Sequence, residues 1–166
     1  MKNILFTLAL LVSFVSFGQT ADEYFDSGYD KAEAKDYYGA IADFTKAIEI
    51  NPNDALAYYN RGNSKKKLKD NNGSIADYTK AIEINPNFAK AYTNRGSSKD
   101  DLKDYYGAIA DFTKAIEINP NDASAYYNRS ITKENLGDIN GACEDAKKAI
   151  SLGKKETGNW VSENCN

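Results

Sequence analysis

The sequence contains no histidine, and it has only two cysteines, three prolines, one tryptophan and one methionine among 166 residues. The lack of histidine removes the commonest general base near neutral pH and the commonest metal ligand. Two cysteines cannot supply the four thiolates of a cysteine-type zinc site. The composition therefore argues against a metal centre and against catalysis that depends on histidine.

An excess of positive charge is also missing, because 24 Asp and Glu stand against 21 Lys and Arg. A nucleic-acid binder usually shows a basic footprint, which is absent here. There is no glycine-rich phosphate loop, no nucleophile elbow and no metal-ligand spacing. We therefore expect no nucleic-acid partner, no cofactor, no metal and no enzymatic activity. A hydrolase is the third functional hypothesis, but no sequence feature identifies a nucleophile for it.

The longest uncharged hydrophobic stretch lies at the N-terminus. Ile4–Phe17 follows Lys2, and Ser16 and Gly18 place small residues at the two positions that signal peptidase recognises. The stretch is short for crossing a bilayer, although an uncleaved membrane anchor is the alternative. We expect residues 1–18 to be a signal peptide cleaved near Gly18. The mature chain would then be exported, periplasmic or secreted, without a membrane span.

The rest of the sequence is a 34-residue unit that occurs four times. Lys35–Arg61 returns at Lys103–Arg129 with one change, a looser copy covers Gly73–Arg95, and a degraded copy covers Gly141–Gly153. Internal repeats of this period indicate a solenoid or an array. We expect repeats at 21–54, 55–88, 89–122 and 123–156, followed by a C-terminal cap at 157–166.

Each copy predicts a pair of helices. In the second copy Asn53 or Asp54 can cap the first helix. Ile75, Tyr78 and Ile82 then follow the spacing of a buried helical stripe. A proline ends each of the first three copies, because the residue before proline leaves the helical region. These prolines lie 34 residues apart: Pro52, Pro86 and Pro120.

The pattern of aromatic and small residues resembles the tetratricopeptide repeat (TPR) family. The fourth copy departs from it, with Ala146 in place of an aromatic residue and Lys154 in place of proline. The resemblance covers residues 21–156 and implies an all-α fold. That fold is a right-handed α-solenoid of four TPR helical hairpins with a short C-terminal capping helix. The second copy shows the full signature: Tyr58, Gly62, Ser74, Tyr78 and Pro86.

The resemblance implies a protein-interaction scaffold that binds an extended peptide or partner segment on its concave face. An asparagine at the sixth repeat position could hold a peptide backbone, because its amide both donates and accepts; a merely solvated asparagine is the alternative. Aromatic residues on this face could anchor side chains. The peptide-binding candidates are Asn60, Asn94, Asn128, Phe25, Tyr29, Tyr59, Asn63 and Tyr127.

A structural or self-associating subunit that uses the convex face or the edge of the stack is the second functional hypothesis. The chaperone-tail site of the family is not expected, because Phe25 and Tyr29 stand where it needs lysine and asparagine. Lys66-Lys67 lies one repeat before Asp100-Asp101. We favour an ion pair between repeats for these charges over a groove with two charged ends.

Other polar residues recur in every repeat or nearly so. We interpret Arg61, Arg95 and Arg129 as structural partners of the recurring aspartates Asp43, Asp77, Asp111 and Asp145. Lysines at the eleventh position should be partly solvated, with their stems on apolar surface. A glycine lies at the start of the second helix of each repeat without an evident reason. The lysines are Lys31, Lys65, Lys99 and Lys133, and the glycines are Gly39, Gly73, Gly107 and Gly141.

The two cysteines and the tryptophan fall in the last repeat and the tail. In an exported protein, Cys143 and Cys165 favour a disulfide that pins the cap, with two free thiols as the alternative. Closing this loop would stabilise the fold by roughly 3 kcal/mol. We expect Trp160 to pack on the last repeat, whereas a ligand-binding tryptophan is the rival interpretation.

Overall fold

The computed structural model describes residues 19–155 and 158–165, so the expected signal segment lies outside the described residues. Within these ranges the chain forms nine α-helices and no β-strand. The first helices of the repeats are α1 (Ala21–Glu33), α3 (Ala55–Lys67), α5 (Ala89–Asp101) and α7 (Ala123–Asn135). The second helices are α2 (Tyr37–Ile50), α4 (Asn71–Ile84), α6 (Tyr105–Ile118) and α8 (Ile139–Ser151), and α9 (Gly158–Asn164) follows them.

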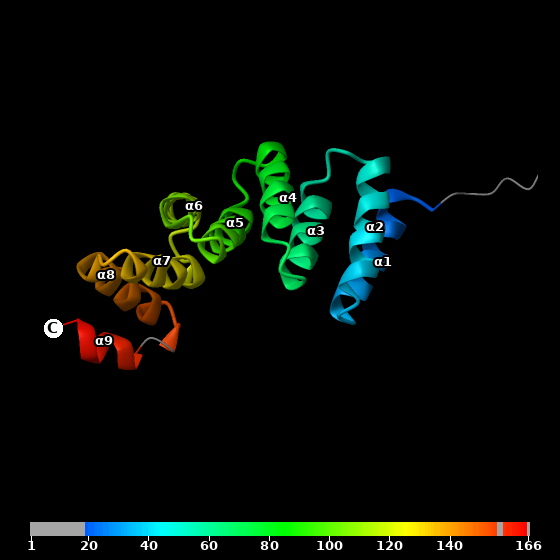
Figure 1. The fold of residues 1–166 in the computed structure, drawn as a ribbon. Coiled ribbons are helices and arrows are strands. Elements are labelled where there is room, and N and C mark those ends of the chain that lie inside the picture. Colours follow the sequence, from blue (N-terminus) through cyan, green and yellow to red (C-terminus); the bar gives the residue numbers. More distant parts are fainter. Residues whose placement is uncertain (1–18, 156–157, 166) are drawn as a thin grey trace, which may run out of the picture.

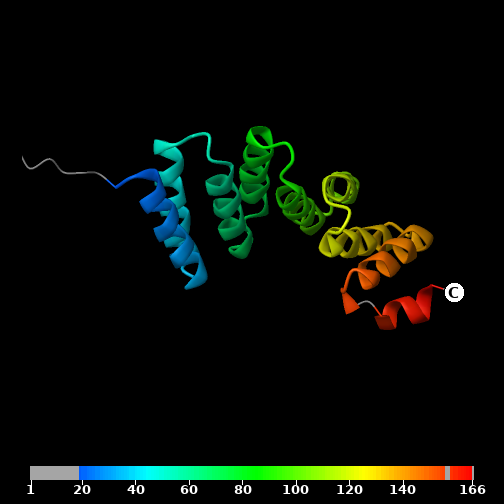
Figure 2. The ribbon, with the colours of Figure 1, turned by 180° about the vertical axis from the view of Figure 1, so that it is seen from behind.

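The helices form a curved row of antiparallel pairs that runs from α1–α2 to α7–α8, with α9 against α8 (Figure 1). The view from behind shows the same succession (Figure 2). Each second helix also packs against the first helix of the next repeat, and neighbouring first helices contact one another. The first helices thus form one continuous face. The expected all-α solenoid of helical hairpins is confirmed.

The second helices all begin with the same local structure. In α4, Oδ1 of Asp70 accepts a hydrogen bond of 2.9 Å from the backbone N–H of Gly73, which caps the helix. A Cβ on Gly73 would collide with this carboxylate. Glycine therefore lets the capping side chain lie against the backbone. This contact explains why a glycine stands at the start of each second helix. The same cap recurs at Asp36–Gly39, Asp104–Gly107 and Asp138–Gly141.

The two helices of a repeat approach closely where a glycine meets an aromatic ring. A Cβ on Gly62 would lie 2.8 Å from Cε1 of Tyr78, which is fully buried. Gly28 faces Phe44 and Gly96 faces Phe112 in the same way. In the fourth repeat both partners change, because Ser130 replaces the glycine and Ala146 replaces the ring. The small residue is thus required by the ring that it faces.

Buried charged clusters join the two helices of repeats two to four. In the third repeat, Arg95 donates to both carboxylate oxygens of Asp111 at 2.7 and 2.9 Å, and Nζ of Lys99 lies 2.8 Å from the same group. Arg95 also donates to Thr79 of the preceding repeat at 3.1 Å. The predicted arginine–aspartate pairing is confirmed. The partly exposed lysine is a third member of the cluster, and its pairing with the aspartate is not predicted by the sequence. The matching clusters are Arg61–Asp77–Lys65 and Arg129–Asp145–Lys133.

Both ends of the row differ from its interior. In the first repeat, Glu23 stands where later repeats bury an alanine such as Ala57. Ser27 takes the place of the recurring arginine and donates to Asp43 at 2.6 Å. Lys31 joins it at 2.6 Å. These polar replacements suit a helix without a preceding repeat, because a terminal repeat must be compatible with water.

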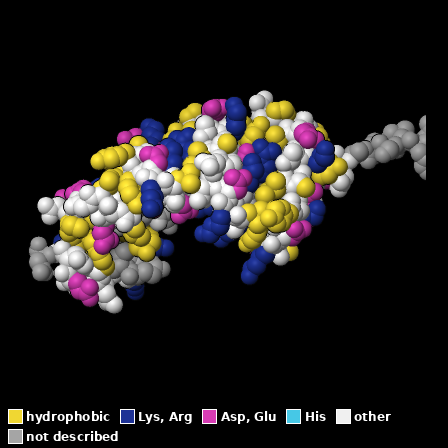
Figure 3. Space-filling view, in the orientation of Figure 1, with side chains coloured by type: hydrophobic (Ala, Val, Ile, Leu, Met, Phe, Trp, Pro, Cys, Tyr) yellow, Lys and Arg dark blue, Asp and Glu magenta, His cyan; other side chains and the backbone are white. Residues whose placement is uncertain are grey.

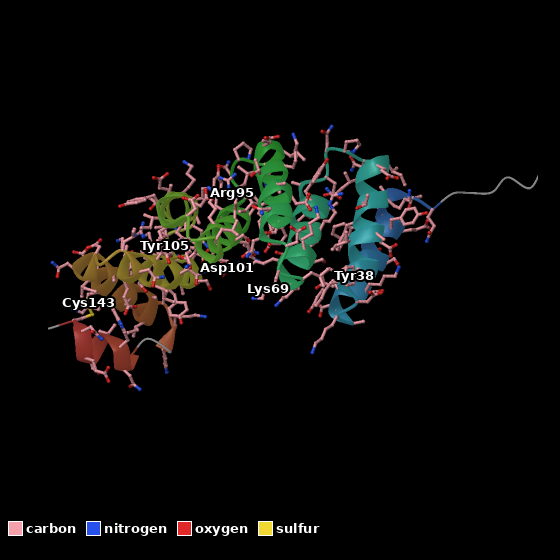
Figure 4. The ribbon with its side chains drawn as sticks, in the orientation of Figure 1. Tyr38, Lys69, Arg95, Asp101, Tyr105 and Cys143 are labelled. Atoms are coloured by element: carbon pink, nitrogen blue, oxygen red, sulfur yellow. A yellow bond between two sulfur atoms is a disulfide. The ribbon has the colours of Figure 1, made fainter. Side chains whose placement is uncertain are left out.

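The C-terminal cap continues the 34-residue register as a shortened first helix. Trp160 lies 34 residues after Tyr126, at the place of the first aromatic residue of each repeat. Its indole is half-buried and donates from Nε1 to Glu134 on α7 at 2.8 Å. A disulfide joins Cys143 on α8 to Cys165 just after α9, and Figure 4 shows this bond between the two helices. None of the described helices combines the length and the hydrophobicity needed to span a membrane.

Candidate peptide-binding groove

A cavity of about 760 Å³ opens on the face formed by α1, α3 and α5. The buried rings of Phe44 and Tyr78 contribute to its lining, together with the small side chains of Ala32 and Ser64. Polar and charged groups complete the wall. They are Tyr29, Glu33, Lys35, Tyr37, Asn60, Asn63, Lys66, Lys67, Lys69 and Asn94.

The cavity lies at the first two junctions because the twelfth repeat position differs between copies. Ala32 is too short to reach the next repeat. Lys66 is longer, and its Nζ lies 3.9 Å from Oδ2 of Asp101. Asp100 accepts a hydrogen bond of 2.7 Å from Thr132 of the fourth repeat. A cavity of only about 50 Å³ lies at this last junction.

A hydrogen-bond network fixes the polar side chains at the second junction. Tyr78 donates to Oδ1 of Asn63 at 2.8 Å. Asn94 donates to the same oxygen at 2.8 Å and to the hydroxyl of Tyr59 at 3.1 Å. Burial raises the pKa of Tyr78, which keeps its hydroxyl protonated and able to donate. The amide nitrogen of Asn63 donates to no other described residue, so this nitrogen remains a donor for a ligand.

Two further side chains of the cavity are available to a ligand. The amide of Asn60 makes no hydrogen bond to another described residue, although it lines the cavity. The ring of Tyr29 is 50% exposed and lies on α1 at one side of the opening. Together with Asn63, these groups offer donors, an acceptor and an aromatic surface within one hollow.

The predicted binding residues divide into two groups. Tyr29, Asn60, Asn63 and Asn94 line the large cavity, whereas Asn128 lines the small one. The other three candidates, Phe25, Tyr59 and Tyr127, line neither cavity.

The three aromatic candidates outside the cavities pack within the scaffold. The ring of Phe25 meets that of Phe44 edge-on, with centroids 5.6 Å apart. The ring of Tyr59 packs 4.8 Å from that of Phe88. Tyr127 lies beneath Nζ of Lys154, which is 5.2 Å from its ring centroid. Their binding role remains a prediction, and the structure gives each of them a packing role.

Of the four lysines that line the cavity, the sequence interpretation considered Lys66 and Lys67 but not Lys35 and Lys69. Lys66 and Lys67 end α3, while Lys35 and Lys69 lie in the turns that follow α1 and α3. The 34-residue spacing of Lys35 and Lys69 is the signal in the sequence that could identify them, but they lie outside the predicted binding face of the first helices. The Lys66–Asp101 contact agrees with the predicted ion pair between repeats. No cluster of metal-ligating side chains occurs among the residues that the structure describes.

The fold and the groove define a helical-repeat protein built from stacked hairpins. The sequence matches the tetratricopeptide repeat at residues 55–88, 89–122 and 112–144, and the TPR repeat at residues 21–69. The chain therefore belongs to the tetratricopeptide repeat family. No curated protein matches the sequence.

Solved structures share this fold over most of the chain. MamA (residues 41 to the end) from Desulfovibrio magneticus RS-1 has a TM-score of 0.78 at 20% identity, covering 85% of this chain and 80% of that one. The first TPR of Spaghetti (RPAP3), bound to the HSP90 peptide SRMEEVD, has a TM-score of 0.70 at 24% identity, covering 72% and 94%. The Arabidopsis OM64 TPR domain has a TM-score of 0.69 at 27% identity, covering 70% and 96%.

Proposed function

We propose that this protein is an interaction scaffold that holds an extended peptide or partner segment in the groove formed by its first helices. The observation that carries the proposal is the open cavity of about 760 Å³, whose wall includes the amide of Asn60 with no partner among the described residues. The peptide bound to the similar RPAP3 repeat domain supports this use of the fold. The partner is a protein or a peptide.

The proposed contacts follow from the chemistry of the lining. Asn60 can donate to a backbone carbonyl and accept from a backbone N–H of the same segment, and Asn63 adds a second donor. The exposed ring of Tyr29 can cover an apolar side chain, since aromatic residues often carry much of the binding energy at interfaces. The network around Asn63 holds its amide in place before binding, which reduces the entropy lost on association.

A self-associating subunit receives less support from the ends of the stack. Glu23 and Ser27 make the first end polar, where interior repeats carry alanine and arginine. At the other end α9 packs on α8 and is tied to it by the Cys143–Cys165 disulfide. Among the described residues, the first end thus replaces the buried alanine of the interior repeats with a charged side chain, and the last end is covered by α9. Binding in the groove therefore agrees better than self-association with a polar first end and a last end covered by α9.

Export is the second part of the proposal. The hydrophobic stretch within residues 1–18 motivates it, and the disulfide supports it because such bonds persist mainly in oxidising compartments. Intact mass measurement of protein purified from the native host should give a chain that begins after Gly18. Protein recovered from the cytosol with its N-terminus intact would contradict export.

The groove is tested with Asn60→Ala and Tyr29→Ala combined in one variant, with Asn128→Ala as the matched control. Asn128 occupies the same repeat position but lies outside the large cavity. Each protein is used to capture partners from an envelope extract, and bound proteins are quantified by mass spectrometry. We expect the double variant to lose at least about fivefold of the specific partner, because each lost hydrogen bond contributes about 1 kcal/mol. Equal capture by the double variant, still folded, would exclude the groove.

A further inference from the structure

Four lysines surround the opening of the large cavity. We call Lys35, Lys66, Lys67 and Lys69 the lysine rim. Glu33 is the single acidic residue in the cavity lining, so the lining is positive although the whole chain carries a net charge of −3. Figure 4 places Lys69 at the lower end of α3, and Figure 3 shows Lys and Arg side chains beside the indentation along that edge. A concentrated positive region on an acidic protein attracts anionic partners.

The rim differs from the eleventh-position lysines in how its charges are satisfied. Lysines at the eleventh position lie against the buried aspartates, as Lys65 does at 2.8 Å from Asp77. In the described part of the chain, Lys35, Lys67 and Lys69 form no ion pair. Their charges are thus available to a ligand, whereas those of the eleventh-position lysines are used by the scaffold.

Backbone geometry does not explain the lysines in the two turns. Lys35, Lys69 and Lys103 all adopt φ 64°, in the left-handed region, and the fourth repeat uses Gly137 at φ 80°. Glycine adopts this conformation without steric cost, while a residue with a Cβ does so under strain. The turn alone would therefore favour glycine. Lys103 is the copy of Lys35 in the duplicated block, and it lies outside the cavity.

The electrostatics of a helix C-terminus does not explain why Lys66 and Lys67 stand at the end of α3. Basic residues in the last turn of a helix are mildly favourable. Yet the corresponding pairs in the other repeats are Ala32-Glu33, Asp100-Asp101 and Glu134-Asn135. Lys66 is also largely covered, with 25% of its side chain exposed. Burial lowers its pKa, and Asp101 at 3.9 Å offsets only part of this effect. A second carboxylate at Lys66 would complete its pairing.

We propose that the groove selects an acidic segment of a partner protein, whose Asp or Glu side chains pair with the lysine rim. This inference rests on the proposed function and specifies the partner chemistry of the same site. The rim lies in the turns and at the end of α3, at repeat positions other than those of Phe25 and Tyr29, where the chaperone-tail site of the family would need lysine and asparagine. The acidic residues Asp100, Asp101 and Glu134 lie further along the row. They confine the acidic part of the ligand to the first two junctions by repulsion.

The test uses the mature chain and a phage library of random peptides of about 12 residues, which span roughly 40 Å when extended. Selection with the unmodified protein should enrich peptides rich in Asp and Glu. The best peptide is then compared with its Gln-for-Glu and Asn-for-Asp analogue by fluorescence polarisation at several salt concentrations. We expect the neutral analogue to bind about tenfold more weakly and the affinity of the acidic peptide to fall as salt rises.

Two variants separate charge from folding. Lys35→Gly with Lys69→Gly removes two rim charges and relieves two strained turns, and we expect it to be more stable and to bind the acidic peptide about tenfold more weakly. Lys103→Gly relieves the same strain outside the cavity, so its affinity should be unchanged.

Other outcomes of these experiments would contradict the acidic partner, the groove or both. Selected peptides without acidic enrichment, but sensitive to Asn60→Ala and Tyr29→Ala, would overturn the acidic partner and retain the groove. Tight binding of a single-stranded oligonucleotide in preference to the acidic peptide, or association of the chain with itself through the rim, would also overturn it. A selection that yields no peptide sensitive to the Asn60 and Tyr29 substitutions would overturn both proposals.

Discussion

At the scale of single residues, the turn lysines are the least expected feature of the chain. Their left-handed backbone, φ 64° in three repeats, usually selects glycine or asparagine. Nothing in the local sequence signals this conformation, because lysine is a good helix former and stands just after a helix. Only Gly137, at the equivalent position of the fourth repeat, signals this conformation in the sequence. Two of the three strained lysines lie at the cavity.

This strain can be measured where the cavity is not involved. Lys103→Gly should raise the free energy of unfolding by about 0.5–1 kcal/mol, because the relief of the left-handed strain exceeds the entropy that glycine gains in the unfolded chain. Gly137→Lys should lower it by a similar amount. Urea denaturation followed by circular dichroism gives both values. A loss of stability in Lys103→Gly would contradict the strain argument.

The recurrence of a small residue and an aromatic residue in each repeat is a residue-scale feature that the sequence shows. Their contact across the two helices does not follow from the repeat period, and neither do the partners of the eleventh-position lysines. Lys65, Lys99 and Lys133 lie beside aspartates on another helix. A periodic pattern shows that a residue recurs, but not which neighbour it contacts.

Gly62→Ala tests the close approach of α3 and α4. The added methyl group would lie within 3 Å of the Tyr78 ring, so the helices must separate. We expect a loss of about 1–3 kcal/mol in the free energy of unfolding. Ser130→Ala is the matched control, since Ala146 leaves no ring opposite it, and its stability should change little. Equal effects of the two substitutions in thermal denaturation would disprove the contact.

At the scale of helices, the arginine–aspartate–lysine clusters join both helices of a repeat and reach the preceding repeat. In each cluster one buried carboxylate receives two basic groups. The arginine contact with a threonine of the repeat before it links neighbouring hairpins. Ser27 in the first repeat makes no such link among the described residues and donates only to Asp43 of its own repeat. The first repeat therefore differs from the later ones in having no arginine that links it to a neighbouring hairpin.

Arg95→Ala should be strongly destabilising, because it leaves Asp111 buried with only part of its compensation. Removing one partner of a buried pair costs about 3–5 kcal/mol, and the remaining Lys99 should reduce this to about 2–3 kcal/mol. Lys114→Ala is the control, since its pair with Glu117 is exposed; it should have little effect. A double-mutant cycle with Asp111→Asn, measured by urea denaturation, gives the coupling. Additive effects would show that the pair is not coupled.

The sequence predicts that a C-terminal cap exists, but not that the cap is related to the repeats. Its helix continues the repeat register, so the tail is a shortened first helix of a fifth unit. The degraded fourth repeat hid this relation, because the expected proline is replaced by Lys154 and the aromatic residue by Ala146. The disulfide compensates for the small area that so short a helix can bury.

Replacement of both cysteines by serine tests the role of the disulfide. We expect the free energy of unfolding to fall by about 3 kcal/mol, since the loop of 22 residues is no longer closed in the unfolded state. Amide exchange in α9 should become faster than in the unmodified protein. Exchange in α5 and α6, which have no contact with the disulfide, should stay the same. Unchanged exchange in α9 would show that packing alone holds the cap.

At the scale of the whole molecule, the repeat period determines the solenoid but not the groove. Three near-copies predict the same hairpin three times, and hence the row of helices. The cavity arises from differences between copies, above all Ala32 where later repeats place Lys66 and Asp100. Such differences predict no shape unless the neighbouring repeat is known. Half of the predicted binding residues line the large cavity for the same reason: the first-helix face was predictable, but its open portion was not.

The most direct test of the central claim maps the bound segment on the protein. Labelled with ¹⁵N, the mature chain is titrated with the captured partner segment or the selected peptide, and amide shifts are followed by NMR. The groove predicts that the side-chain amides of Asn60, Asn63 and Asn94 and the backbone of Lys66–Lys69 shift most, with little change in α6 and α8. Shifts confined to the second helices or to the ends of the row would contradict it.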